Sequence, residues 1–392
     1  MTPDSGHDTD RPRDGVHAMV PRQEMSPGAR RLRDTYDVTP GAPFYQEEFG
    51  YYCLERWKEQ GMPQDVPKAE LFGYDPPGRH NLWQMGWTTV NFVPPFEEKV
   101  LEDRGEHELV QDSAGRHVLF FKGRRSGFMP EYEDHPVKDR QSWEENVKWR
   151  MDPENPDRYA ETAAMLEQAR EAAAEGRIIT ECIIGGYMYL RSLFGPLDLM
   201  YKLNDAPDLI QDCMERWFDL ADAICARHQE EVSIDELYLG EDICYNHGPL
   251  IGPEMIRRFL FPYYEQLLRN IRRRQIDPDR HLHFHLDTDG HAPAVIPLYQ
   301  ELGMDVMSPF EVASGCDVVE IGREYPDLVI SGGVDKRELA RGREAIDRLV
   351  DRIFPPMRER GGYIPTCDHG VPEEVDYEDY LYYRERCLEF AE

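Results

Sequence analysis

Residues 281–330 read HLHFHLDTDGHAPAVIPLYQELGMDVMSPFEVASGCDVVEIGREYPDLVI, and this stretch decides the fold. Short apolar runs lie at His281–Leu286, Asp305–Met307 and Leu328–Ile330, and segments of helical length, such as Ala292–Glu301, separate them. Runs of this length are typical of buried strands. Because strands that alternate with helices form βαβ units, the stretch predicts a parallel sheet.

The same alternation extends to both sides of this stretch. Further strands are expected at Arg177–Ile184, Glu236–Leu239 and Tyr363–Ile364, and further helices at Pro253–Arg273 and Ala345–Arg360. With the remaining strands supplied from upstream, the pattern predicts an α/β fold, namely an eight-stranded (β/α)8 TIM barrel. A doubly wound sheet is the alternative, but the G-x-G-x-x-G motif of its dinucleotide-binding form does not follow the first strand.

The N-terminal region lacks this regularity. Residues 1–42 contain five prolines among charged and small polar residues, which predicts a disordered or loosely packed tail before a barrel domain over residues 43–392. Upstream of the regular part, His117–Phe121 is expected to form a strand and Asn81–Val93 to hold another. A helix that precedes the first regular strand is expected to end at Gly176.

Composition excludes several classes of partner. The chain has 45 Lys+Arg against 76 Asp+Glu, a formal net charge of -31, whereas nucleic acids and anionic membranes both require a basic face. No run of about 18 apolar residues occurs, so no membrane span is expected. The 8 cysteines are scattered and the N-terminus lacks an apolar signal segment, so a cytoplasmic location is expected.

Acidic residues follow most of the predicted strands. The carboxyl ends of the strands of a parallel barrel meet at one mouth, where active sites are built. Like charges crowded in one cavity raise one another's pKa or require a cation, so a proton-handling site or a metal site is expected. For any single Asp the alternative is an N-cap of the next helix. The residues at these strand ends are Glu241, Asp242, Asp287, Asp289, Glu311, Asp335, Cys367, Asp368 and His369.

Three histidines and a glycine pair add to this pattern. The alternation of His281, His283 and His285 places three imidazoles on one side of a strand. Only the last of them lies near the mouth, so structural roles are expected for the first two, and both roles stay open for His285. Gly185-Gly186, after another predicted strand, permits close backbone approach near the cavity.

Segments 241–268, 285–342 and 361–385 resemble the uroporphyrinogen decarboxylase superfamily, most closely its branch of corrinoid-dependent methyltransferases. The resemblance implies a barrel with its cavity at the C-terminal mouth of the strands. The decarboxylases carry a Met-Arg-Gln-Ala-Gly-Arg run whose arginines hold substrate carboxylates, and this run is absent here. The methyltransferases hold zinc with a His-x-Cys-Gly motif and a later Cys. Here the motif reads Asp287-Thr288-Asp289-Gly290, and Cys367 matches the later Cys.

The resemblance implies metal-assisted methyl (one-carbon) transfer that involves a corrinoid or a small methylated substrate, with the metal as Lewis acid. The expected ligands of zinc or another divalent metal are Asp287, Asp289, Cys367 and Glu241. The expected catalytic residues are His369 as general acid or base, Asp289, and Asp335 or Glu311 to orient the imidazole. The expected substrate contacts are Glu241, Asp242, Gly185, Tyr187 and Tyr363.

Two alternatives remain open. One is decarboxylation of tetrapyrrole acetate side chains without metal or cofactor, in which Asp287 or Asp289 would stabilise a protonated pyrrole and His369 would position a carboxylate. The other is a non-catalytic barrel that binds a corrinoid or another ligand. The expected partners are a small-molecule or tetrapyrrole substrate, a corrinoid protein and a second copy of the chain, but neither nucleic acid nor a membrane.

Overall fold

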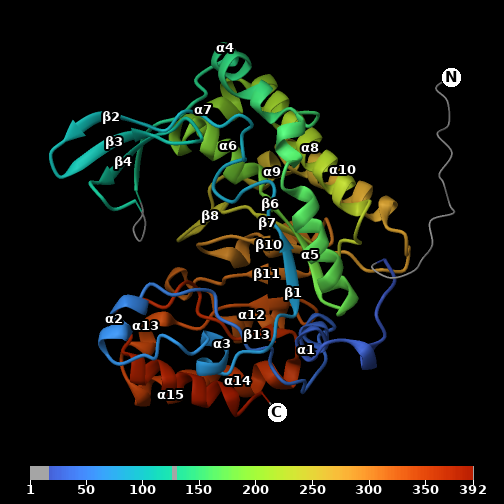
Figure 1. Cartoon of the computed structure of the whole chain (residues 1–392), viewed down its shortest axis with the longest axis vertical. Coiled ribbons are helices and arrows are strands. Elements are labelled where there is room, and N and C mark those ends of the chain that lie inside the picture. The colour runs from blue at the N-terminus through green and yellow to red at the C-terminus, as the bar shows by residue number, and fades with distance from the viewer. Residues whose placement is uncertain (1–16, 126–129, 392) are drawn as a thin grey trace.

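The computed structural model describes residues 17–125 and 130–391, and within them seven parallel strands form one curled sheet through the middle of the molecule (Figure 1). The strands lie side by side in chain order, as successive crossovers of one hand produce. The α/β class and the barrel-type arrangement of the predicted strands are therefore confirmed. The order is β1 (Arg79–Leu82), β6 (Ile178–Ile184), β7 (Glu236–Gly240), β10 (His283–Asp287), β11 (Val306–Ser308), β12 (Val329–Ser331) and β13 (Tyr363–Ile364).

Helices cover the outer face of this sheet. The longest described helix, α8 (Pro207–Gln229), buries residues three and four apart, which is the spacing of one helix face, and packs against α10 (Phe261–Arg274). At the other side α14 (Arg343–Arg360) packs against α12 (Val318–Glu324) and α15 (Tyr377–Leu388). Shorter helices complete the cover: α5 (Thr162–Ala174), α6 (Gly186–Phe194), α7 (Pro196–Asp205), α11 (Ile296–Gln300) and α13 (Lys336–Leu339).

The helix predicted over Pro253–Arg273 is divided into two. Its first part is α9 (Pro253–Phe259), and α10 begins at Phe261, directly after Leu260. Pro262 has no backbone N–H to donate to the preceding turn, so the hydrogen-bond ladder is interrupted there. The predicted stop at Gly176 is confirmed, because α5 ends two residues earlier and Gly176 adopts a φ of 78°.

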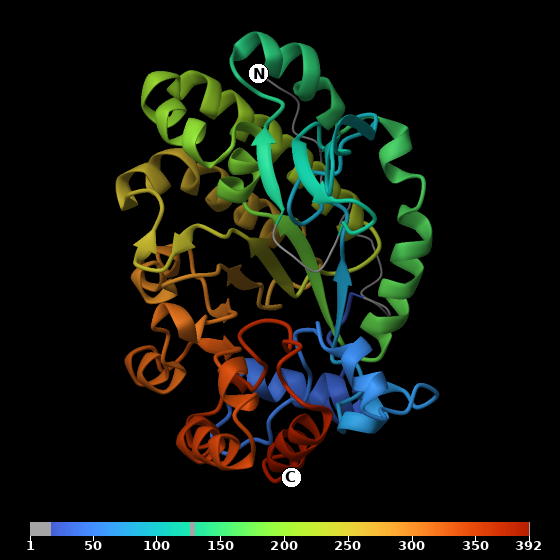
Figure 2. The same cartoon turned by 90° about the vertical axis from the view of Figure 1, so that its left-hand side faces the viewer.

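An antiparallel sheet that the sequence did not predict lies between β1 and β6 in the chain. It consists of β2 (Lys99–Arg104), β3 (His107–Gln111), β4 (His117–Phe121) and β5 (Glu131–Asp134). Figure 2 shows this meander in front of the upper part of the parallel sheet. The run His117–Phe121 thus forms a strand as expected, but in the meander. The strand expected within Asn81–Val93 is β1, which begins two residues earlier and ends at Leu82.

Part of the expected N-terminal tail is packed. Helix α1 (Pro27–Tyr36) has Ser26 as its N-cap, and its Leu32 and Tyr36 are buried against Ile178 and Val306 at the start of the parallel strands. Figure 1 shows α1 near α14 and the C-terminus. The prediction of a loosely packed tail is therefore wrong for α1, because the apolar face of this helix covers the N-terminal ends of the parallel strands. Residues 1–16 of the expected tail lie outside the described residues.

Aromatic side chains join the other N-terminal helices to the C-terminal one. Trp57 of α2 (Leu54–Glu59) is fully buried and donates to the backbone oxygen of Val375 at 2.8 Å. Phe72 of α3 (Lys68–Phe72) and Tyr380 of α15 lie with their ring centroids 5.1 Å apart. In Figures 1 and 2 the helices α2, α3 and α15 accordingly lie together in the lower part of the view, away from the meander.

Candidate functional site

A cavity of about 410 Å³ lies at the carboxyl ends of β7 and β10, beneath the meander. Its volume is in the range of small-molecule sites. Its position agrees with the mouth of a parallel barrel, where chemistry is built from strand ends. The cavity is lined by Trp87, Thr88, Arg116, Pro130, Tyr132, His135, Met188, Arg191, Ser192, Pro196, Gly240, Asp242, Asp287 and Asp289.

Asp287, the last residue of β10, lies on the floor of this cavity and is 6% exposed. Its carboxyl accepts hydrogen bonds from the hydroxyls of Ser308 and Tyr238. Burial, together with the negative charge of Asp289 and Asp242, raises its pKa to about 7, although these hydrogen bonds oppose the rise. At neutral pH this carboxyl therefore both gives and takes protons, as a general acid or base requires.

Asp242 lies beside Asp287 because of an unusual backbone turn. Its φ is 41°, and the N–H groups of Glu241 and Asp242 both donate to the backbone oxygen of Asp287, at 2.9 and 3.2 Å. A non-glycine residue in this left-handed region is uncommon and is often found at functional sites. Burial raises the pKa of Asp242, and its ion pair with Arg191 of α6 opposes that rise.

Asp289 pairs with His369, which comes from the segment after β13. The Nε2 atom of His369 lies 3.0 Å from Oδ1 of Asp289. Burial disfavours the imidazolium of His369, but the hydrogen bond and charge of Asp289 outweigh it and raise the pKa. The other ring nitrogen, Nδ1, is buried without a hydrogen-bond partner. The structure thus brings Asp287, Asp289 and Asp242 to one cavity, with His369 behind Asp289.

A chain of buried polar groups continues from Asp287 into the barrel. Nε2 of His285 lies 2.9 Å from the hydroxyl of Ser308, and Nδ1 of His285 lies 2.8 Å from Oε1 of Glu236. Tyr36 of α1 donates to the same Oε1 at 2.7 Å. Burial opposes ionisation of Glu236, but its hydrogen bond and ion pair with His285 lower the pKa well below the usual range. Ser308 can pass a proton between His285 and Asp287, because a hydroxyl both donates and accepts.

Glu241, expected to bind metal or substrate, points away from the cavity. Its fully buried carboxyl accepts from the hydroxyls of Tyr264 at 2.6 Å and Tyr299 at 3.2 Å, and from the N–H of Tyr187 at 3.2 Å. Burial raises its pKa to about 7. A Cβ on Gly185 would lie 2.0 Å from Oε2 of Glu241, so this glycine makes room for the carboxyl. These residues anchor α6 and do not line the cavity.

The two acids expected to orient His369 hold loops in place. Asp335 caps α13 by accepting from the N–H of Arg337 at 2.9 Å and pairs with the guanidinium of that residue. This is the N-cap alternative for an acid after a strand. Glu311 accepts from the N–H of Gly290 at 3.0 Å and thereby fixes the loop that carries Asp289. Neither acid contacts His369, so both act by positioning backbone.

Cys367 and Tyr363 belong to the core. The Cys367 thiol is fully buried, and burial raises its pKa well above the usual range. Its backbone N–H donates to Glu48 at 2.8 Å. Tyr363 packs against Phe44 with ring centroids 5.4 Å apart and donates to the backbone oxygen of Gly332 at 3.0 Å. Neither residue lines the cavity, so a substrate contact by Tyr363 is not supported.

The four expected metal ligands do not fit a zinc site. Zinc requires donor atoms that converge on one point about 2.0–2.3 Å from each of them, and sulfur bound to zinc is a thiolate. Cys367 is a buried thiol away from the cavity, and both oxygens of Glu241 are engaged by tyrosines. Among the described residues, one group of three His, Cys, Asp or Glu donors lies close enough to share an ion, and it consists of His281, His283 and Asp305.

The walls of the cavity hold residues that the sequence analysis missed. Trp87 and Arg116 come from segments around the meander, and Tyr132 lies in β5. The Arg116 guanidinium lies 4.8 Å from the ring centroid of Tyr132, and Trp87 stacks on Tyr238 with centroids 5.5 Å apart. Periodicity gave no signal for these residues, because they lie outside the regular alternation of strands and helices.

Comparison with known proteins agrees with this architecture. The family model described as "Uroporphyrinogen decarboxylase (URO-D)" matches residues 129–388. The chain belongs to the uroporphyrinogen decarboxylase family. This match contains the segments on which the resemblance rested and all the acids on the floor of the cavity. No curated protein sequence matches this family member.

Solved structures share the fold at low sequence identity. A methyltransferase from Methanosarcina mazei is 14% identical, with 93% of this chain and 99% of that chain covered and a TM-score of 0.58. A B12-independent methionine synthase from Shewanella sp. W3-18-1 is 11% identical, with 59% and 65% covered and a TM-score of 0.34. The first similarity shows a common fold. None of the described helices has the length and apolar character to cross a membrane.

Proposed function

We propose that this uroporphyrinogen decarboxylase family member is an enzyme that removes a methyl group from a small methylated acid, with Asp287 as the proton donor. The observation that carries the proposal is a buried carboxyl with a pKa of about 7 on the floor of a cavity. The expected zinc ligands do not converge, so proton donation replaces Lewis-acid activation in this proposal. Similarity of fold to a methyltransferase from Methanosarcina mazei supports the reaction class.

The walls of the cavity favour a flat substrate with one anionic end. Trp87 and Tyr132 offer aromatic faces, and Arg116 and Arg191 offer guanidinium groups. Burial lowers the pKa of His135 to about 4, so this neighbour is neutral at pH 7. A carboxylate held at the arginines would leave the far end of the substrate at the floor, beside Asp287. The substrate class is therefore a carboxylic acid that bears a methyl ether or thioether.

Proton donation balances the charge of this reaction. When the methyl group moves to a nucleophile, the bonding electron pair stays on the oxygen or sulfur, which becomes an anion. Asp287 in its protonated form donates its proton to that atom and becomes a carboxylate, and Ser308 is placed to stabilise it by a hydrogen bond. A corrinoid on a partner protein would supply the nucleophilic acceptor of the methyl group. Asp289, paired with His369, would form the part of the cavity floor that is exposed to solvent.

A spectroscopic assay tests the proposal. The protein is incubated with reduced corrinoid and a panel of carboxylic acids that carry methyl ethers or thioethers, and the absorbance change of the corrinoid reports methyl transfer. Asp287→Asn is expected to lower the rate by about 10²–10⁴-fold, the usual contribution of general acid–base catalysis. Asp335→Asn serves as the matched control, because Asp335 is also an acid after a strand but caps α13 outside the cavity. Equal rates for Asp287→Asn and the native protein would contradict the proposal.

The decarboxylase alternative has weaker support from the cavity. A tetrapyrrole with many acetate and propionate groups requires many cations, and the described lining residues with positive charge are Arg116 and Arg191. Each of them also pairs with an acid, Asp112 or Asp242, so together they suit one substrate carboxylate and not many. Release of CO₂ from the same panel of acids, with the corrinoid spectrum unchanged, would favour decarboxylation. Binding without either reaction would favour a non-catalytic barrel.

A further inference from the structure

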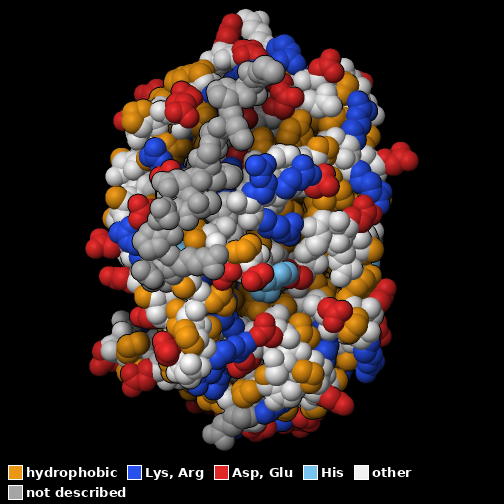
Figure 3. Space-filling view, turned by 90° about the vertical axis from the view of Figure 1, so that its right-hand side faces the viewer, with side chains coloured by type: hydrophobic (Ala, Val, Ile, Leu, Met, Phe, Trp, Pro, Cys, Tyr) orange, Lys and Arg blue, Asp and Glu red, His pale blue; other side chains and the backbone are white. Residues whose placement is uncertain are grey.

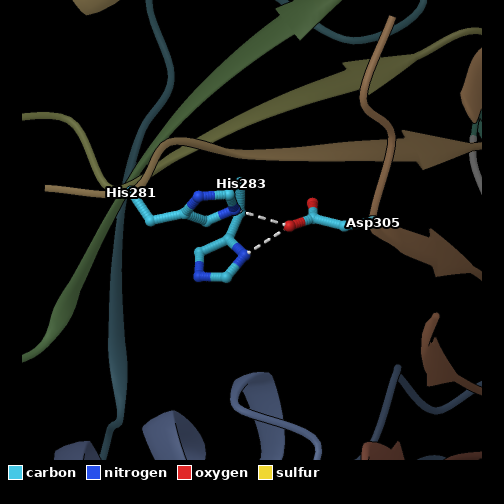
Figure 4. A group of neighbouring side chains, drawn as sticks. All are labelled: His281, His283 and Asp305. Carbon is cyan, nitrogen blue, oxygen red and sulfur yellow. Dashed lines mark hydrogen bonds and ion pairs between the residues drawn. The ribbon is translucent and has the colours of Figure 1, made fainter. Parts of the chain in front are cut away.

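A second cluster of polar side chains lies at the opposite ends of the same strands. Nε2 of His281 and Nδ1 of His283 lie 2.8 and 2.9 Å from one atom, Oδ2 of Asp305 (Figure 4). His283 is the first residue of β10, whereas Asp287 on the cavity floor is its last. At about 3.3 Å per residue the two ends of this strand are about 13 Å apart. The cluster is therefore separate from the cavity.

Strand geometry explains why these donors converge. His281 lies two residues before the first residue of β10, His283, and the two imidazole rings are 4.5 Å apart between centroids. Asp305 directly precedes β11, the neighbour of β10. Its Oδ1 accepts from the N–H of Phe284 at 2.9 Å, which fixes the carboxylate and turns Oδ2 toward the imidazoles.

The donor atoms suit a transition metal. Zinc binds imidazole nitrogen and carboxylate oxygen at about 2.0–2.2 Å, which places neighbouring ligands of a tetrahedral ion about 3.3–3.6 Å apart. The three donor atoms lie within 4.8 Å of one another, and the separations of 2.8 and 2.9 Å from Oδ2 need to widen by about 0.4–0.8 Å. Imidazole donors select zinc, nickel or copper over magnesium and calcium, which prefer an all-oxygen shell.

Access from solvent is open on this side. The His281 side chain is 65% exposed, while His283 and Asp305 are 15% and 28% exposed. On the face of the molecule drawn in Figure 3 a histidine is exposed between acidic side chains. An ion bound here would keep positions for water beside its three protein ligands.

We propose that His281, His283 and Asp305 form a binding site for a divalent transition metal ion, with zinc as its expected occupant. The ion would replace the protons that the imidazoles now share with Oδ2 of Asp305. It would join the N-terminal ends of β10 and β11 and thereby stabilise this end of the parallel sheet. The site is independent of the proposed methyl transfer, because no residue of the cavity takes part.

Titration of the untagged, chelator-treated full-length protein with ZnCl₂, followed by calorimetry, tests this site. One ion is expected per chain, and it should raise the thermal midpoint of unfolding. His281→Ala and Asp305→Asn should each weaken binding at least about tenfold, since even the loss of an outer-shell partner costs that much. The Asp305→Asn variant keeps a side-chain oxygen that can accept the hydrogen bond from the backbone N–H of Phe284. His247→Ala, in another exposed histidine, serves as the control and should bind like the native protein.

Cobalt substitution separates this site from the cysteines. Co²⁺ bound by two imidazoles and a carboxylate should give d–d absorption without a sulfur-to-metal charge-transfer band. A charge-transfer band would place the ion at a thiolate and overturn the proposal. Stoichiometric binding that survives in both His281→Ala and Asp305→Asn would also overturn it, as would the lack of zinc binding by the native protein. None of these results depends on methyl-transfer activity.

Discussion

His285 Nε2 lies 2.9 Å from the hydroxyl of Ser308, and this hydroxyl donates to the carboxyl of Asp287. The floor of the cavity is thereby connected to a buried imidazole by one side chain. The hydrogen bond from Ser308 stabilises the carboxylate form of Asp287 and opposes the rise in pKa that burial causes. Ser308 therefore adjusts the pH at which Asp287 carries its proton.

Ser308→Ala should move the alkaline limb of the pH profile. Without this donor the pKa of Asp287 should rise further above about 7. Because the proposed reaction uses the protonated carboxyl, kcat/KM should fall with rising pH through that pKa, and the fall should shift to higher pH in the variant. Ser331→Ala, on β12, is the matched control and should keep the native profile. A limb that stays in place or moves to lower pH would contradict the role of Ser308.

Asp289→Asn should lower the pKa of His369. Burial disfavours the imidazolium, and the hydrogen bond and charge of Asp289 reverse that effect in the native protein. With a neutral amide in place of the carboxylate, the burial effect should dominate. NMR titration of the imidazole protons measures this pKa directly, with Asp335→Asn as the control. An unchanged His369 titration in Asp289→Asn would show that the pair does not form in solution.

Glu241→Gln should reduce the loss of stability between pH 5 and pH 8. The pKa of Glu241 is about 7 in the folded protein and near 4.5 when unfolded, so the folded state holds a proton that the unfolded chain releases. Stability is therefore fully present below pH 4.5 and is lost as pH rises through 7, by up to about 3 kcal/mol. Urea unfolding at both pH values measures the difference. Equal pH dependence in variant and native protein would refute this assignment.

Gly185→Ala should destabilise the fold. A Cβ there would lie 2.7 Å from Cα of Glu241 and 2.0 Å from its Oε2, and the backbone atom cannot move aside easily. Overpacking of this kind costs about 1–3 kcal/mol. Gly50→Ala is the control, because the nearest atom to its Cβ, Cα of Gly370, is 4.0 Å away. The midpoint of urea unfolding compares the two variants, and equal midpoints would show that the loop of Gly185 adapts.

The parallel sheet was predictable because its strands are short apolar runs. Residues 178–184, for example, are buried throughout, and a run of this length after a glycine is typical of a buried strand. The meander was missed because β2 is exposed along its whole length and therefore shows no apolar alternation. Helix α1 was missed because its proline and its charges resemble those of a tail, although its apolar face is buried by tertiary contacts.

The residues of the cavity floor could be predicted from their positions at the carboxyl ends of parallel strands, but the residues of its walls could not. Asp242, Asp287 and Asp289 lie where parallel strands terminate, so their convergence was implied by topology. Arg116 and Trp87 lie far from these strands in the sequence, and only the packing of the meander brings them to the cavity. The thiol of Cys367 is buried and does not line the cavity, and spacing along the sequence does not reveal this orientation.

The cavity is built from two parts of the chain that are separate in sequence. The family match begins at residue 129, so Asp287, Asp289 and His369 lie within it, whereas Trp87 and Arg116 precede it. The acids on the floor are thus encoded apart from part of the cavity wall. Substitutions in that part of the wall leave the residues of the floor unchanged. Transplanting the segment around Trp87 and Arg116 between relatives would accordingly be a route to new selectivity.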